Sequence, residues 1–167
     1  EYVKIPEENL QGDTLLLPDG ISMEDATLTE PTACVVKGFK RARIRQGDIV
    51  LVQGLGTMGQ LNIVLAKHYG AKKVIAADFQ KFRCDYAKKS GADLVVNLNE
   101  HDLFEAVKDA TGGAMAYIVV VGPSSIKAME EGIRCCGRGG TVLLFTPTPK
   151  EENLLINPHD IYFNEIS

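Results

Sequence analysis

The most informative stretch of the sequence is IVLVQGLGTMG, at residues 49–59. It opens on an uninterrupted apolar run, which is typical of a strand buried on both faces of a sheet. Three glycines follow, Gly54, Gly56 and Gly59, and apolar residues then recur at helical spacing as far as His68. The stretch therefore predicts a buried strand, a glycine-rich turn, and a helix over 57–68 that begins inside the glycine loop.

Strands and helices continue to alternate after this stretch. Further apolar runs predict strands at 74–77, 94–96, 117–121 and 141–145, and the segments between them predict helices at 81–89, 102–109 and 125–136. Continuous Val, Ile and Leu strands separated by helices are typical of an α/β domain with a doubly wound parallel sheet. We expect this domain to occupy residues 31–167.

The two ends of the chain have weaker patterns. Short apolar runs broken by proline and glycine predict short strands and turns over 1–20. Ser22 is predicted to cap a helix, and Pro31 is predicted to interrupt that helix. The apolar spacing over 32–40 predicts a second helix. The run 161–167 is interpreted as the start of another strand.

The glycine loop has the spacing of a phosphate-binding turn. Gly54 permits the tight turn, Gly56 lets the backbone approach a pyrophosphate, and Gly59 lets the helix pack closely on the strand. The first helical residues, Thr57 and Met58, bring unpaired N–H groups and the positive end of the helix dipole to the same place. The glycines alone are also compatible with a plain strand–helix turn.

An acid at the end of the second strand extends this site. Asp78 follows Gly59 by 19 residues, close to the ~20 expected for the acid that binds an adenosine ribose. Its carboxylate would accept hydrogen bonds from ribose hydroxyls and repel a 2′-phosphate, which favours NAD over NADP. Lys81 and Arg83 lie near Asp78 in the sequence, and either cation could bind a 2′-phosphate and so oppose this preference. Taken alone, Asp78 also suits a helix N-cap.

The ends of the fourth and fifth strands complete the predicted site. Carboxyl ends of parallel strands flank the cofactor crevice in doubly wound sheets, which nominates residues at the ends of 117–121 and 141–145. The predicted cofactor-binding residues are Gly54, Gly56, Thr57, Met58, Gly59, Asp78, Arg83, Val121, Gly122, Phe145 and Thr146.

Composition narrows the class of protein. The 167 residues are 45% hydrophobic and 24% charged, as in ordinary globular domains, and the net charge of -4 argues against nucleic acid as a partner. The sequence has no apolar run near the ~20 residues of a membrane span and no apolar leader, so we expect a cytoplasmic protein with no membrane partner. We interpret all four cysteines as reduced thiols: Cys34, Cys84, Cys135 and Cys136.

Several motifs together resemble a known family. They are EPTAC at 30–34, GDIVLVQGLG at 47–56, AKHYGA at 66–71, RCDYAKKSGAD at 83–93 and GGTV at 139–142. The combination resembles the zinc-dependent branch of the medium-chain dehydrogenase/reductase family, around sorbitol, threonine and alcohol dehydrogenases. The resemblance implies a Rossmann domain over 31–167, preceded at 1–30 by the tail end of a GroES-like catalytic domain.

The resemblance also implies a chemistry. The family transfers hydride between an alcohol, here a secondary alcohol or polyol, and NAD, with a zinc ion polarising the alcohol oxygen. Most zinc ligands would lie outside this sequence, and Glu30 alone matches a metal-side position, although it also suits a surface carboxylate. Cys34 and Met58 would lie beside the nicotinamide and Arg83 beside the adenosine. We expect a segment of a longer enzyme with little turnover of its own.

Other functions stay open at this point. A zinc-free NADP-dependent quinone or enoyl reductase of the same superfamily is one, although Asp78 and Glu30 speak against it. An S-adenosylmethionine methyltransferase usually has an acid where Gln53 stands, and a non-catalytic NAD-sensing domain would need only the cofactor site. Strand 117–121 is wholly apolar where the family often has acids, and two prolines follow Phe145. The apolar edge strand 141–145 predicts a homodimer or homotetramer.

Overall fold

The computed structural model describes residues 2–167 and divides the chain into two compact units, with the boundary between Glu30 and Pro31. The first unit contains helices α1 (Glu7–Gly12) and α2 (Met23–Ala26). The strands predicted for 1–20 are wrong for residues 2–20, because α1 occupies the middle of this segment; Glu1 lies outside the described residues. Two glutamates in the first turn of α1 match the positive end of its helix dipole.

The prediction for Ser22 is confirmed, and the prediction for Pro31 is wrong. The Ser22 hydroxyl accepts a hydrogen bond from the backbone N–H of Asp25 at 3.0 Å and caps α2. Helix α3 (Thr29–Ala42) then runs through Pro31 without a break. Proline is tolerated there because it stands in the first turn, where the missing N–H would have had no partner inside the helix.

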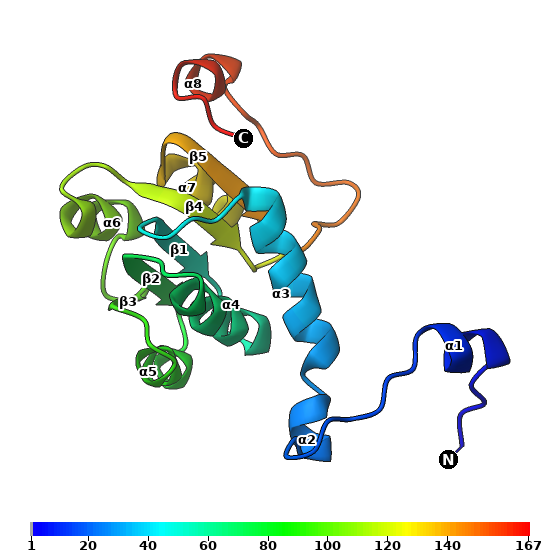
Figure 1. Cartoon of the computed structure of the whole chain (residues 1–167). Helices are drawn as coiled ribbons and strands as arrows, with labels where there is room; N and C mark the ends of the chain where they lie inside the picture. Colours follow the sequence, from blue (N-terminus) through cyan, green and yellow to red (C-terminus); the bar gives the residue numbers. More distant parts are fainter. Residues whose placement is uncertain (1) are drawn as a thin grey trace. The chain divides into compact units, whose positions relative to one another are not determined.

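The predicted doubly wound α/β fold is confirmed in the second unit. Its five strands are all parallel and lie in the order β3-β2-β1-β4-β5 (Figure 1). The strands are β1 (Ile49–Gln53), β2 (Lys73–Asp78), β3 (Leu94–Asn97), β4 (Ala116–Val121) and β5 (Cys136–Leu144). The helices that alternate with them are α4 (Thr57–His68), α5 (Lys81–Lys89), α6 (Leu103–Thr111) and α7 (Ile126–Arg134).

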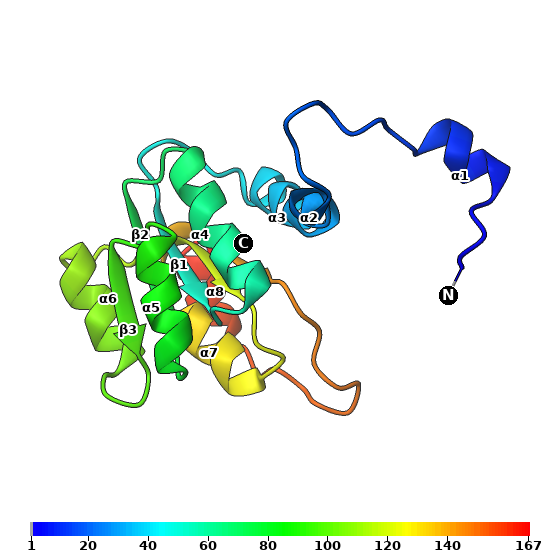
Figure 2. The same cartoon turned by 90° about the horizontal axis from the view of Figure 1, so that it is seen from below.

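Helices cover both faces of this sheet (Figures 1 and 2). Buried residues of α3, α4 and α5 pack on one face, among them Phe39, Ile63 and Ala87. Those of α6 and α7 pack on the other, among them Leu103 and Met129. The central strand β1 is therefore fully covered, which explains why its sequence is a continuous apolar run.

The chain after α7 departs from the prediction. Strand β5 begins at Cys136 rather than at residue 141, because Cys136 already pairs with Ala116 before a register shift. The strand predicted over 161–167 is wrong, since helix α8 (Pro158–Phe163) includes the first three residues of this segment. The Asn157 side chain caps α8, and Pro158 stands where its fixed φ suits a helix start.

The buried cysteines are poor nucleophiles. Cys84, Cys135 and Cys136 are buried free thiols. Burial raises the pKa of Cys135 to about 12 and that of Cys136 to about 11, so at neutral pH neither forms the reactive thiolate. Among residues 2–167 we find no helix with the length and apolar character needed to span a bilayer.

A carboxylate ties the turn before β3 to the sheet. The Oδ2 of Asp93 accepts a hydrogen bond from the Val74 N–H at 2.6 Å, and the Lys67 Nζ lies 3.0 Å from its Oδ1. Burial works to raise the pKa of Asp93, but these contacts outweigh burial and hold the pKa below its usual value. The ionised form of Asp93 therefore stabilises the fold.

We expect Asp93→Asn to lower the free energy of unfolding near pH 7 by about 1 kcal/mol, a modest value because the side chain is 36% exposed. A folded pKa below the unfolded value of about 4 means that this stabilisation exists above that pH and is lost as the pH falls through the folded pKa. Urea unfolding at about pH 7 and about pH 3 checks this, with Asp109→Asn as an exposed control. An equal difference at both pH values would contradict it.

Candidate functional site

The glycine loop lies at the point where the strand order reverses. Strand β1 stands between β2 and β4, the position at which doubly wound sheets open a crevice. The Gly54 backbone adopts a φ of 81°, which only glycine takes without strain. The Gly54 N–H donates to the Ala77 carbonyl at 2.9 Å, and the Gly122 N–H donates to the Gln53 carbonyl at 3.0 Å. The loop is thus tied to both neighbouring strands.

The other two glycines of the loop have different surroundings. A Cβ on Gly59 would lie 2.0 Å from the Gly54 carbonyl oxygen, so Gly59 sets how closely α4 packs on the turn. A Cβ on Gly56 would meet nothing within 4 Å. Gly56 is also the N-cap of α4 and offers no side-chain cap. The first turn of α4 therefore presents N–H groups to open space, which is the arrangement that binds phosphates.

Asp78 connects the loop to the end of β2. Its side chain is only 5% exposed, and its Oδ2 accepts a hydrogen bond from the Leu55 N–H at 2.7 Å. Its Oδ1 accepts one from the Gln80 N–H at 2.8 Å, and the Arg83 Nη1 lies 3.6 Å from Oδ2. The N-cap of α5 is Gln80 rather than Asp78. A carboxylate has about four acceptor positions, so Asp78 keeps capacity for a further donor.

A cavity of about 620 Å³ brings most of the predicted residues together. Ten of the eleven predicted cofactor-binding residues line it, from four separate segments of the chain. They are Gly54, Gly56, Thr57, Met58 and Gly59 from the loop, Asp78 and Arg83 from β2 and α5, and Gly122, Phe145 and Thr146 after β4 and β5. The cavity is thus a single concave site over the carboxyl ends of the strands.

Two predicted residues are not among those that line this cavity. Val121 is fully buried in the core on the α6 and α7 side, and Val120 and Pro123 line the cavity in its place. Glu30 is an exposed residue of the first unit, and its role at a metal stays a prediction. Within residues 2–167 no three His, Cys, Asp or Glu side chains gather to hold a metal ion.

Six polar or charged residues of the cavity were not predicted: Gln53, Asn62, Gln80, Ser125, Lys127 and Glu131. The Gln53 Oε1 and the Asn62 Oδ1 are buried and have no hydrogen-bond partner. Burial raises the pKa of Glu131, and the charge of Asp102 raises it further. The sequence does hold a signal for Gln53, since burying a polar side chain at the end of a strand costs free energy unless a partner forms a hydrogen bond with it. For Glu131 only the fold shows which side of α7 faces the site.

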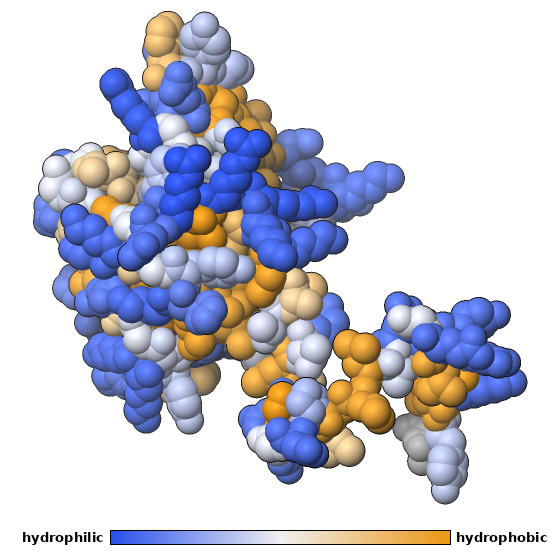
Figure 3. Space-filling model, in the orientation of Figure 1, coloured by the Kyte–Doolittle hydropathy of each residue, from blue (hydrophilic) through white to orange (hydrophobic). Residues whose placement is uncertain are grey.

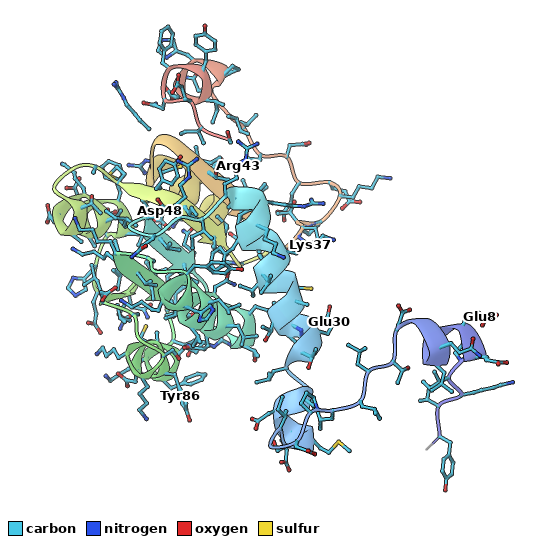
Figure 4. All side chains as sticks on the ribbon, in the orientation of Figure 1. Glu8, Glu30, Lys37, Arg43, Asp48 and Tyr86 are labelled. Carbon is cyan, nitrogen blue, oxygen red and sulfur yellow. The ribbon has the colours of Figure 1, made fainter. Side chains whose placement is uncertain are left out.

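A basic surface lies away from the cavity lining. Five exposed side chains follow the last turns of α3 and the loop after it: Lys37, Lys40, Arg41, Arg43 and Arg45. Lys37 projects from α3 and Arg43 lies at its end (Figure 4), where Figure 3 shows long hydrophilic side chains. Asp48 accepts a hydrogen bond from the Arg45 N–H at 2.7 Å and fastens the loop.

Comparison with known proteins adds a second kind of observation. The family model of zinc-binding dehydrogenases matches residues 57–167. Sorbitol dehydrogenase of Bacillus subtilis is 28% identical over 99% of the chain, and L-threonine 3-dehydrogenase of Pyrococcus horikoshii is 34% identical over 94%. The matched stretches are 46% and 44% of those two proteins. The chain thus spans less than half the length of these curated relatives.

A solved structure supports the same relationship. A zinc-binding dehydrogenase from Sinorhizobium meliloti, bound to NADP, matches with a TM-score of 0.77 and 28% identity. The match covers 81% of this chain and 40% of that one. The cofactor in that structure is NADP.

Proposed function

The chain belongs to the zinc-binding dehydrogenase family, as its motifs predicted, and from that premise we propose that it is the NAD-binding part of an alcohol or polyol dehydrogenase. The whole enzyme would transfer hydride between a secondary alcohol and NAD. The observation that carries the proposal is the uncapped first turn of α4 beside the open space at Gly56, with Asp78 one strand away. These features match the pyrophosphate and the ribose of one dinucleotide.

The residues present fit the cofactor along its length. The loop N–H groups would hold the pyrophosphate, and Asp78 would accept hydrogen bonds from the adenosine ribose. Phe145 and Thr146 line the cavity after β5, and Met58 lines it from α4. All three would contact the nicotinamide ring, which accepts or gives the hydride when the cofactor is bound. The zinc ion of the whole enzyme would rest mainly on residues that this chain does not supply.

We propose NAD rather than NADP on the charge of Asp78. A buried carboxylate at the ribose would repel a 2′-phosphate, and its ion pair with Arg83 occupies the nearest guanidinium. The chain has no tryptophan, so calorimetry is the more direct assay. Titration should show saturable binding of NADH, NADPH weaker by roughly tenfold or more, and no binding of S-adenosylmethionine.

Each alternative has its own outcome in this titration. Tighter binding of NADPH than of NADH would favour the zinc-free reductase and would contradict the selector role of Asp78. Binding of S-adenosylmethionine in place of both dinucleotides would favour the methyltransferase. NADH binding without turnover of any alcohol is what we expect of this chain alone, because the substrate and zinc sites of the proposed enzyme lie largely elsewhere.

We also keep the homodimer or homotetramer as a proposal. Strand β5 lies at the edge of the sheet, and the exposed fraction of Leu144 on it is 51%. Part of this edge is already used, because the Val142 N–H donates to the Ser167 carbonyl and the Ser167 N–H donates to the Gly140 carbonyl. An edge with apolar side chains is a site at which a second sheet could pair.

A further inference from the structure

The cavity extends beyond Asp78 on the side of the sheet that α7 covers. Three apolar residues line this part of the cavity, Ala77, Leu98 and Ala128, and all three pack with the core cluster of α6 and α7. Two polar side chains share the same side, Gln53 and Glu131. We call these five residues the base lobe. Because Ala77 directly precedes Asp78, the base lobe adjoins the proposed ribose position.

Gln53 is held in the base lobe by the helix above it. Its side chain is 2% exposed, and a Cβ on Gly132 of α7 would lie 2.7 Å from its Oε1. The amide fits only because residue 132 has no side chain. The side-chain amide oxygen of Gln53, Oε1, has no hydrogen-bond partner. A buried polar group left in this state usually meets a water or a ligand.

Glu131 stands directly before Gly132 on α7 and is partly buried. Asp102 at the start of α6 acts on it as a like charge, and Lys127 and Arg134 on its own helix act as opposite charges. Among the described residues, neither Lys127 nor Arg134 forms an ion pair with Glu131 within 4 Å. Its carboxylate therefore remains an acceptor inside a lobe with apolar walls.

We propose that Glu131, assisted by Gln53, selects adenine at this end of the site by accepting a hydrogen bond from the exocyclic amine of the base. The inference rests on the proposed function, because Asp78 fixes where the ribose and hence its base lie. A flat base would pack among Ala77, Leu98 and Ala128. Adenine offers a donor to the carboxylate, whereas hypoxanthine offers an oxygen at the same position, which a carboxylate repels.

The test compares NADH by calorimetric titration with reduced nicotinamide hypoxanthine dinucleotide, whose base has an oxygen in place of that amine and a proton on the neighbouring N1. The unchanged chain should bind NADH roughly tenfold or more tightly than the hypoxanthine analogue. In Glu131→Gln the new amide both donates and accepts, so the preference should fall to about one, mainly through tighter binding of the analogue. Glu130→Gln, an exposed neighbour on the same helix, should keep the full preference.

The outcomes separate this inference from the proposed function. Saturable NADH binding with no preference over the analogue would overturn the role of Glu131 and leave the dinucleotide site standing. A preference for NADH that persists in Glu131→Gln would also overturn the role of Glu131 without contradicting the dinucleotide site. A purely structural role for Glu131 would weaken both dinucleotides equally and lower the melting temperature, which is measured alongside. Failure of both dinucleotides to bind would overturn the proposed function and this inference together.

Discussion

Gly56→Ala should weaken NADH binding by roughly tenfold to a hundredfold and leave the melting temperature unchanged. The φ of Gly56 is -69°, which alanine adopts readily, and a Cβ there would meet no protein atom within 4 Å. The added methyl would instead fill the space through which the pyrophosphate approaches the first turn of α4. Calorimetric titration with NADH and thermal unfolding of the same samples measure the two quantities.

Gly59→Ala is the matched comparison for this change. Its Cβ would lie 2.0 Å from the Gly54 carbonyl oxygen, so α4 must move away from the turn. We expect a loss of about 1–3 kcal/mol in the free energy of unfolding as well as weaker binding. Equal loss of stability in both variants would show that Gly56 is needed only for the turn. Unchanged NADH affinity in Gly56→Ala would contradict the proposal that the pyrophosphate binds at this loop.

Asp78→Asn should reverse the cofactor preference. The amide oxygen still accepts from the Leu55 N–H, so the loop keeps its tie, but the charged acceptor for the ribose hydroxyls is gone. We expect NADH affinity to fall roughly tenfold to a hundredfold, the worth of hydrogen bonds to a charged group. NADPH should gain, because the repulsion of its 2′-phosphate disappears and Arg83 loses its ion-pair partner.

Calorimetry with both dinucleotides measures this change, and Asp85→Asn on α5 serves as the control. Asp85 pairs with Lys81 and Lys88 at 3.6 Å and 3.7 Å and does not line the cavity. The control should therefore keep the affinities of the unchanged chain. Equal weakening of NADH and NADPH in Asp78→Asn would mean that the carboxylate supports the loop without touching the ribose.

The sequence was most informative where burial and periodicity agree. Helix α4 and helix α5 begin and end at the predicted residues, because apolar strands and glycine turns bound them on both sides. Prediction failed over 2–20 and at 161–163, where helices α1 and α8 formed instead of the expected strands. Asn157 and Pro158 start a helix in a segment whose Ile161, Tyr162 and Phe163 favour a strand.

The candidate site was predictable as far as its backbone motif. The loop spacing and the position of Asp78 indicate a dinucleotide site, because both are fixed relative to strands that the sequence reveals. Val120 lines the cavity and Val121 does not, which the sequence could not show, since a continuous apolar strand has no alternation to tell which side faces the cavity. The role of Val121 at the cofactor stays a prediction. Glu131 was missed for a similar reason: only the packing of Gly132 against Gln53 reveals the side of α7 that faces the site.

The central claim is that the first turn of α4 binds the phosphates of a nicotinamide dinucleotide. Amide ¹H–¹⁵N spectra of the chain, recorded during titration with NADH, test it most directly. The predicted result is that the Gly56, Thr57 and Met58 amide signals shift most and saturate together. Saturable binding that leaves these three signals in place while others move would contradict it.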